Sequence, residues 1–260
     1  MTVRARADVV SSFTIIKGPL VEETYRICCS WDFTKDVDAN LESTLSPEFI
    51  GGRSSNWARD VRFVIRRRFD FNGPDRALAE LAQRQIQMQF WKPIMLWHMT
   101  RDEFLVRDFF STFLYGQHRD GTLYLQKNDV IPYLEDLKQP GRSGEGWTAR
   151  TAGEVAGQLL KIATEFGFLA GNTKKTFATY QLPDEVFIYL LHFLAEHRAN
   201  ARAIIHAEEW RLFLLDPDDV ERDILRLHQF RKLHYEVAGS LAQLTLPCES
   251  ALAYARRMAA

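Results

Sequence analysis

Residues 54–69 read SSNWARDVRFVIRRRF, and the spacing of apolar and basic residues in this stretch predicts an amphipathic helix. At 100° per residue, apolar side chains gather on one side of the helix and arginines form a row on the opposite side. The apolar side comprises Trp57, Val61, Val64 and Ile65, and the row comprises Arg59, Arg62 and Arg66. Like charges in one row cost stability on an isolated helix, and a phosphate partner would offset that cost.

The beginning of this predicted helix favours a bound anion. Ser54, Ser55 or Asn56 caps it, and Arg53 directly precedes the cap. Hydroxyl groups, free backbone N–H groups and the positive end of the helix dipole together attract a phosphate. A shorter helix is expected over about residues 34–43. The two helices resemble a helix-turn-helix, whose second helix lies in the major groove.

Charge is unevenly distributed along the 260 residues, although the net charge is only −1. Residues 53–68 hold six arginines, Arg67 among them, and one acid, which gives a local charge of +5. Residues 184–224 hold ten acids and four arginines, which gives a local charge of −6. We therefore expect one face that meets an anion. The alternative is a solvated basic face, or one that pairs with the acidic C-terminal half.

A second candidate helix spans Thr148 to Phe166. Its apolar stripe is Ala152, Val155, Leu159, Ile162 and Phe166, and the opposite side carries Arg150, Gly153, Gly157, Lys161 and Thr164. Each glycine costs about 1 kcal/mol relative to alanine in a helix interior, so the pair is expected to permit a close approach by a sugar-phosphate backbone or another helix. Two short strands flank residues 171–176, with Lys174 and Lys175 in the turn, and read as a wing. A helix near residues 128–137 precedes the long helix. The order of helix, long helix and hairpin is that of a winged helix-turn-helix.

The whole pattern predicts a mainly α fold, a globular helical bundle with two helix-turn-helix-like elements and one or two small β-hairpin wings. Three regions are expected within one unit: an N-terminal helical region (1–92), a winged-helix-like region (93–182) and a C-terminal helical region with a hairpin (183–260).

The sequence contains no G-x-G-x-x-G, Walker A or H-E-x-x-H motif, so we predict no catalytic residue, metal or cofactor. Three cysteines, two of them adjacent, exclude a disulfide framework. A membrane span needs about 20 apolar residues in succession, and the longest apolar stretch falls short of that. These features predict a soluble protein of the cytoplasm.

Several segments, taken in order, resemble the BrxA family of the bacteriophage-exclusion (BREX) phage-defence systems. They are residues 18–23 (GPLVEE), 54–69 with the arginine row, 91–98 (WKPIMLWH), 108–110 (DFF), 148–169 and 189–194 (YLLHFL). The resemblance covers about residues 13–215. It implies a small all-α monomer that binds double-stranded DNA through helix-turn-helix elements. It also implies work beside a methyltransferase and other defence proteins.

From the residues and the resemblance we expect a non-enzymatic accessory protein that binds double-stranded DNA mainly through phosphate contacts. The candidate contacts are Arg53, Ser54, Ser55, Arg59, Arg62, Arg66, Arg67, Arg150, Lys161, Lys174 and Lys175. One alternative is a protein–protein scaffold within the defence complex, whose arginine row docks an acidic partner. A second alternative is an enzyme such as a nuclease.

Overall fold

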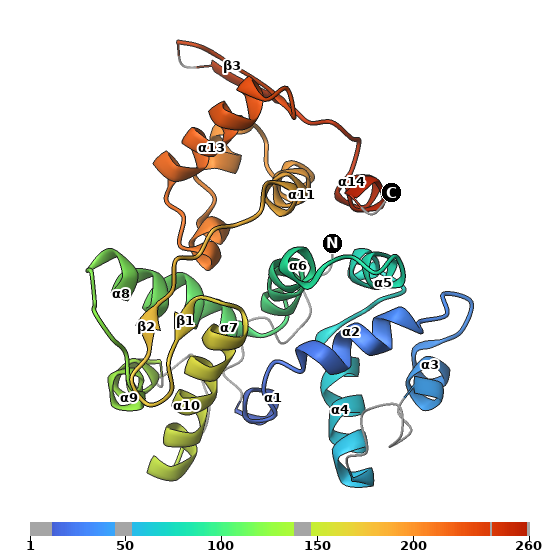
Figure 1. Ribbon diagram of the computed structural model, residues 1–260, viewed down its shortest axis with the longest axis vertical. Coiled ribbons are helices and arrows are strands. Elements are labelled where there is room, and N and C mark those ends of the chain that lie inside the picture. Colours follow the sequence, from blue (N-terminus) through green and yellow to red (C-terminus); the bar gives the residue numbers. More distant parts are fainter. Residues whose placement is uncertain (1–11, 45–53, 138–146, 240, 259–260) are drawn as a thin grey trace.

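The computed structural model describes residues 12–44, 54–137, 147–239 and 241–258 of the chain. It is mainly helical with two small antiparallel hairpins, which confirms the predicted fold class (Figure 1). The first part contains α1 (Phe13–Ile16), α2 (Val21–Cys29), α3 (Val37–Thr44), α4 (Ser55–Arg68) and α5 (Arg76–Gln83). The middle part contains α6 (Met88–Thr100), α7 (Phe104–Asp108), the π-helical η1 (Phe109–Leu114), α8 (Tyr115–Arg119), α9 (Lys127–Asp136), α10 (Ala149–Glu165), β1 (Leu169–Ala170) and β2 (Thr176–Phe177). The last part contains α11 (Asp184–Ala195), α12 (Ala201–Ile205), the 3-10 helix η2 (Glu208–Phe213), α13 (Pro217–Gln229), β3 (His234–Ala238), β4 (Leu241–Thr245) and α14 (Ala251–Met258).

Both candidate helices form where the apolar spacing predicts them. The Ser54 hydroxyl caps α4 by accepting a hydrogen bond from the Trp57 amide at 3.3 Å. The Thr148 hydroxyl caps α10 in the same way, with the Thr151 amide at 3.2 Å. The expected apolar stripes face the core, where Val61 in α4 is fully buried. At both helices, the capping residue and the spacing of apolar residues therefore predict the same element that the structure shows.

The helical pattern of residues 75–91 is interrupted in the structure. Residues 75–91 have the pattern of a single helix, yet the structure divides them between α5 and α6. Gln85 adopts the left-handed conformation (φ 56°), and the Ile86 amide bonds back to the Leu81 carbonyl at 3.2 Å. That six-to-one hydrogen bond is the Schellman way of ending a helix, which a glutamine rarely signals in a sequence.

The first hairpin gains a third strand-like segment from outside it. β1 and β2 pair antiparallel, with Leu169 opposite Phe177. Leu125, just before α9, pairs with Lys175 through two backbone hydrogen bonds of 2.7 and 2.9 Å. The order along the chain is therefore a short strand, α9, α10 and a hairpin that returns to that strand.

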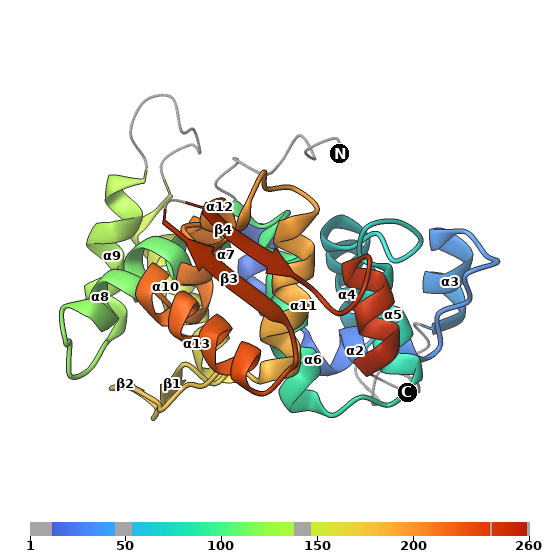
Figure 2. The ribbon, with the colours of Figure 1, turned by 90° about the horizontal axis from the view of Figure 1, so that it is seen from above.

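The two ends of the chain fasten separate parts of the molecule to one another. At the lower edge of Figure 1, α1 lies between α4 and α10. α1 packs on α10, and the Lys17 ammonium that follows it pairs with Asp60 of α4 at 2.6 Å. Figure 2, seen from above, shows α14 beside α5. There Arg256 binds both oxygens of Glu80, at 2.6 and 2.8 Å, and this hydrogen bonding lowers the pKa of Glu80 to about 2.

A buried guanidinium joins three elements at the centre of the fold. Arg68, the last residue of α4, has a fully buried side chain that donates to Glu103 at 3.0 Å. Its Nη1 also donates to the Pro19 carbonyl at 3.1 Å. Glu103 is the residue that precedes α7, and Pro19 lies in the turn before α2. One side chain thus holds the end of α4 against the starts of α2 and α7.

A second group of buried polar side chains, linked by hydrogen bonds, lies near Arg68. His98 Nδ1 is 2.7 Å from Asp75, and His98 Nε2 is 2.7 Å from the Tyr189 hydroxyl, so the ring links α5's start to α6 and α11. Arg101 adds a 3.1 Å contact to the same carboxylate. Burial opposes the charged carboxylate, but the His98 hydrogen bond and the nearby cations outweigh it and lower the pKa of Asp75. Burial also lowers the pKa of His98.

Among the residues that the structure describes, no helix combines the length and the apolar character that a membrane span requires.

Glu103→Gln should lower the free energy of unfolding by about 3 kcal/mol, because it removes the carboxylate that is paired with the buried Arg68 charge. Denaturant unfolding measures this loss. Glu42→Gln is the matched control, since it removes a carboxylate from an exposed pair and should cost less than about 1 kcal/mol. Equal costs for the two variants would show that Arg68 does not depend on Glu103.

Stability should fall as the pH falls from about 6.5 towards 4. Burial lowers the pKa of His192 from 6.5 to about 4, so between those values the unfolded chain binds the proton that the folded chain rejects. The stabilisation from a neutral His192 is fully present above pH 6.5, and roughly 2 kcal/mol of it is lost by about pH 5. His192→Leu should flatten the curve of melting temperature against pH. An unchanged curve would contradict a buried neutral His192.

Candidate nucleic-acid interface

The arginine row of α4 lies beside acidic side chains of α3. Arg62 pairs with Glu42 at 2.9 Å, and Arg66 pairs with Asp38. Asp38 and Glu42 are about half or more exposed, so these are surface pairs. Arg59 is exposed and has no ion pair among the described residues. The expected alternative of pairing with the C-terminal half is wrong for Arg62 and Arg66, because their acids come from the neighbouring helix.

The remaining residues of this stretch divide into exposed and buried ones. Ser54 and Ser55 are exposed at the start of α4, as an anion site requires. Arg67 is half-buried, and Arg68 is buried against Glu103. Arg53 lies outside the described residues. The local charge of +5 therefore overstates the charge at the surface, since Arg68 faces the interior.

The connection between α3 and α4 is longer than a helix-turn-helix requires. α3 ends at Thr44 and α4 begins at Ser55, so residues 45–54 join them. A helix-turn-helix joins its helices through three or four residues. α3 and α4 lie next to each other, but their link differs from that motif.

The exposed side of α10 carries charge that is balanced within the helix. Arg150 pairs with Glu154 at 3.0 Å, and Lys161 lies 3.6 Å from Glu165. Each pair has i,i+4 spacing, which places both partners on one face. Of the two predicted contacts on α10, both are exposed, and both already have a carboxylate beside them.

The two glycines of α10 lie under a lysine from α9. A Cβ atom at Gly153 would be 3.0 Å from Cε of Lys127 and 3.1 Å from its Nζ, and a Cβ at Gly157 would be 4.0 Å from Cδ. Gly153 is buried as a result, whereas its spacing in the sequence predicted an open face. The close approach that the glycines permit is made by this lysine stem.

The turn between β1 and β2 places its two lysines differently. The Lys174 ammonium lies over the Tyr124 ring, 4.8 Å from its centroid, and stays exposed. The Lys175 ammonium donates to the Gly171 carbonyl at 3.0 Å, and burial lowers its pKa. Lys174 is thus the lysine of the turn that faces outward.

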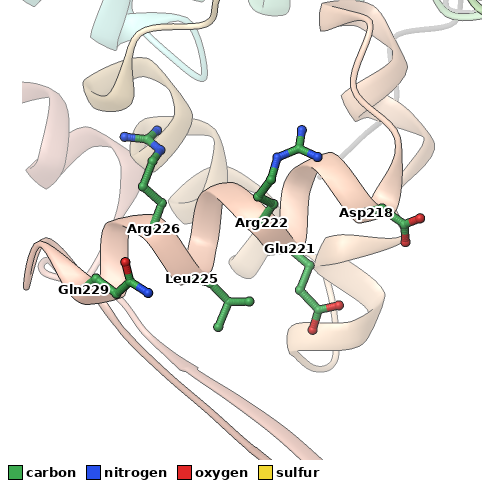
Figure 3. A pocket seen from close by; sticks show the side chains of 6 residues that line it. All are labelled: Asp218, Glu221, Arg222, Leu225, Arg226 and Gln229. Carbon is green, nitrogen blue, oxygen red and sulfur yellow. The ribbon is translucent and has the colours of Figure 1, made fainter.

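A second helix with a following hairpin, α13 with β3 and β4, carries an excess of acidic side chains. Figure 3 shows a shallow groove along α13 in which Arg222 and Arg226 extend on one side of the helix and Glu221 and Leu225 on the other. Arg222 pairs with Asp219, and Arg226 pairs with Asp184 at 2.7 Å. α13 carries four acids against two arginines, whereas α10 carries two acids against two cations, so the α13 surface suits a phosphate backbone less than α10 does.

A cleft between α6, α7 and η2 also contains charged side chains. Arg101 pairs with Asp75, and Arg198 pairs with Glu209. Arg101 also lies over the Phe193 ring, 5.0 Å from its centroid. No sequence pattern signals this cleft, because its residues come from distant segments. Its paired charges make it part of the interior network rather than an anion site.

Sequence reasoning missed Lys127, the residue that lies over the α10 glycines. The sequence signal that could have indicated such a contact was the pair of glycines four residues apart on one face of α10. Two glycines on one helix face indicate that another group packs closely against that face. It also missed the buried partners of Arg68, His98 and Tyr189, because burial of charged groups leaves no periodic pattern.

Comparison with known proteins identifies a family and a fold. The BrxA family pattern matches residues 12–192 of the chain. Among solved structures, the chain is similar to an uncharacterized protein from Magnetospirillum magneticum, with a TM-score of 0.60 and 15% sequence identity. That similarity covers 79% of this chain and 98% of the other, and at this identity it concerns the fold alone. A comparison with curated proteins gave no match.

Proposed function

The chain belongs to the BrxA family, which makes it a component of a BREX phage-defence system, and on this premise we propose that it is a non-enzymatic accessory protein that binds double-stranded DNA. The observation that carries the proposal is the arrangement around α10. This helix exposes one polar side next to the start of α9 and to the β1–β2 turn with Lys174. A short strand at Leu125 precedes α9 and pairs with that turn. The order of a short strand, α9, α10 and a hairpin resembles a winged helix-turn-helix, although residues 137–148 join α9 to α10 by a longer connection than the three or four residues of that motif. We propose α10 as the helix that enters a groove.

The α4 surface supports the same proposal as a second set of phosphate contacts. Arg59, Arg62 and Arg66 lie on one exposed side, and the Ser54 cap leaves the positive end of the helix dipole at the surface. Surface ion pairs such as those of Arg62 and Arg66 contribute about 0–1 kcal/mol, so a phosphate can compete with the α3 carboxylates.

The candidate contacts on both surfaces are cations and hydroxyls, which position a DNA backbone. We assign them no catalytic step and no cofactor. We further propose a cytoplasmic monomer that acts beside the other defence proteins, including the methyltransferase, as the family resemblance implies.

One observation favours the alternative function of a protein scaffold. Arg62 and Arg66 already bind carboxylates of α3, so the row can recognise acidic side chains of a partner. An acidic protein surface and a DNA backbone differ in the salt dependence of binding, which a titration resolves.

Wild-type protein should shift duplex DNA in a gel assay, with log K falling steeply as salt rises, because phosphate contacts release counterions. Replacing Arg59, Arg62 and Arg66 together with alanine should flatten the slope by about 0.9 for each phosphate that is no longer neutralised. The fold should survive, since these side chains lie opposite the buried stripe.

Plasmid incubated with the protein and Mg²⁺ should remain intact, whereas nicking would favour the nuclease alternative. Absence of any shift at low salt would sink the DNA proposal and favour the scaffold.

Asp38→Asn combined with Glu42→Gln should tighten DNA binding a few-fold, because it removes the carboxylates that compete for Arg62 and Arg66. Glu208→Gln with Glu236→Gln is the control, since it changes the net charge equally at exposed acids of η2 and β3. Fluorescence anisotropy with a labelled duplex measures the DNA affinity of both double variants. If the two double variants tighten binding equally, only net charge matters and α3 does not compete.

A further inference from the structure

We infer that Lys127, lying over Gly153 and Gly157 of α10, is the principal phosphate-binding cation of the α10 surface. This inference rests on the proposed function and names a residue of the same surface. The ligand is a backbone phosphate of duplex DNA that runs along the exposed side of α10.

The position of Lys127 is fixed from two directions. It is the first residue of α9, and the Asp129 carboxylate accepts a hydrogen bond from the Gln126 amide at 2.7 Å, which fixes the start of that helix. On its other side, Leu125 is held by its two backbone hydrogen bonds to Lys175. The backbone therefore has little freedom, and the side chain extends from a defined place across α10.

The glycines determine where the ammonium lies. At Gly153 an added Cβ would be within 3.0–3.1 Å of the last two heavy atoms of the lysine. At Gly157 it would be 4.0 Å from Cδ and Cε, so the stem passes over this residue in ordinary contact. Both positions carry only hydrogen, and the lysine stem therefore lies directly on the backbone of α10. This contact accounts for the glycine at position 153, which is unfavourable in a helix interior; at position 157 a Cβ atom would fit beside the stem.

Of the three cations that lie on α10 within the described residues, Arg150 and Lys161 are each paired with an acid and Lys127 is not; Lys174 at the β1–β2 turn has no ion pair either. The acid in each pair is a glutamate four residues further along α10. The nearest acid along its own helix, Asp129, is engaged with the Gln126 amide. A phosphate that approaches α10 therefore meets a net positive charge at Lys127 and balanced pairs elsewhere on the helix.

Three variants test this assignment in salt titrations with a labelled duplex. Lys127→Met retains most of the stem and removes the charge, so the slope of log K against log salt should flatten by about 0.9. At fixed salt near 100 mM, this variant should bind several-fold more weakly. Gly153→Ala keeps the lysine but displaces its ammonium, so it should weaken binding in the same direction by a smaller factor.

Gly153→Ala separates this role from a structural one. Alanine favours a helix more than glycine does, and the atoms it meets are the flexible end of a side chain, so the melting temperature should rise by about 2–4 °C. Higher stability with weaker DNA binding is the expected combination. The control is Arg26→Gln with Glu22→Gln, which removes an exposed i,i+4 pair of α2 at constant net charge and should leave the slope nearly unchanged.

The outcomes distinguish this inference from the function on which it rests. If the wild-type protein does not bind duplex DNA, the proposed function fails and the inference with it. If the wild type binds and Lys127→Met keeps the wild-type slope, the inference alone is overturned. It is overturned equally if Gly153→Ala binds as tightly as the wild type while the control pair loses affinity.

Discussion

The Arg68 guanidinium is the contact on which the arrangement of the helices depends. A buried charge is costly unless it is paired and hydrogen-bonded, and the Glu103 carboxylate and the Pro19 carbonyl offset that cost for Arg68. Those two partners belong to the segments that begin α7 and α2. Packing of the apolar stripes alone would allow several relative positions of these helices, and the paired charge selects one.

The same constraint sets which cations remain at the surface. Arg68 fixes the C-terminal end of α4, and the opposite end, which Ser54 caps, begins the helix. In Figure 1 the start of α4 points away from α5 and α6. α10 is held along its length by α9 and α1, and its exposed side is left between α9 and the β1–β2 turn. Both candidate surfaces therefore consist of a well-packed helix with one polar side open to a ligand.

Much of the fold could be predicted because it depends on local pattern. The apolar period and capping residues located α4 and α10, and turn residues located both hairpins. The break at Gln85 could not be predicted, since a left-handed glutamine leaves no sequence signal. The candidate site was harder to predict than the fold. Ser54, Ser55, Arg59 and Lys174 are exposed as expected. Acidic side chains lie beside the other cations, Arg62, Arg66, Arg150 and Lys161, and Lys127 contacts α10 only through the folding of the chain. Spacing along one helix cannot report such contacts.

Amide hydrogen–deuterium exchange with and without duplex DNA tests the central claim most directly, namely that α10, the start of α9 and the β1–β2 turn form the DNA-binding surface. We expect duplex DNA to slow exchange at the start of α9, in the first half of α10 and in residues 171–175, with a second region of slowing at the start of α4. Exchange should be unchanged in α13 and in the β3–β4 hairpin, because acids outnumber arginines along α13. Slowing confined to α13 and that hairpin, or no change at α10 under conditions where the duplex is bound, would contradict this claim.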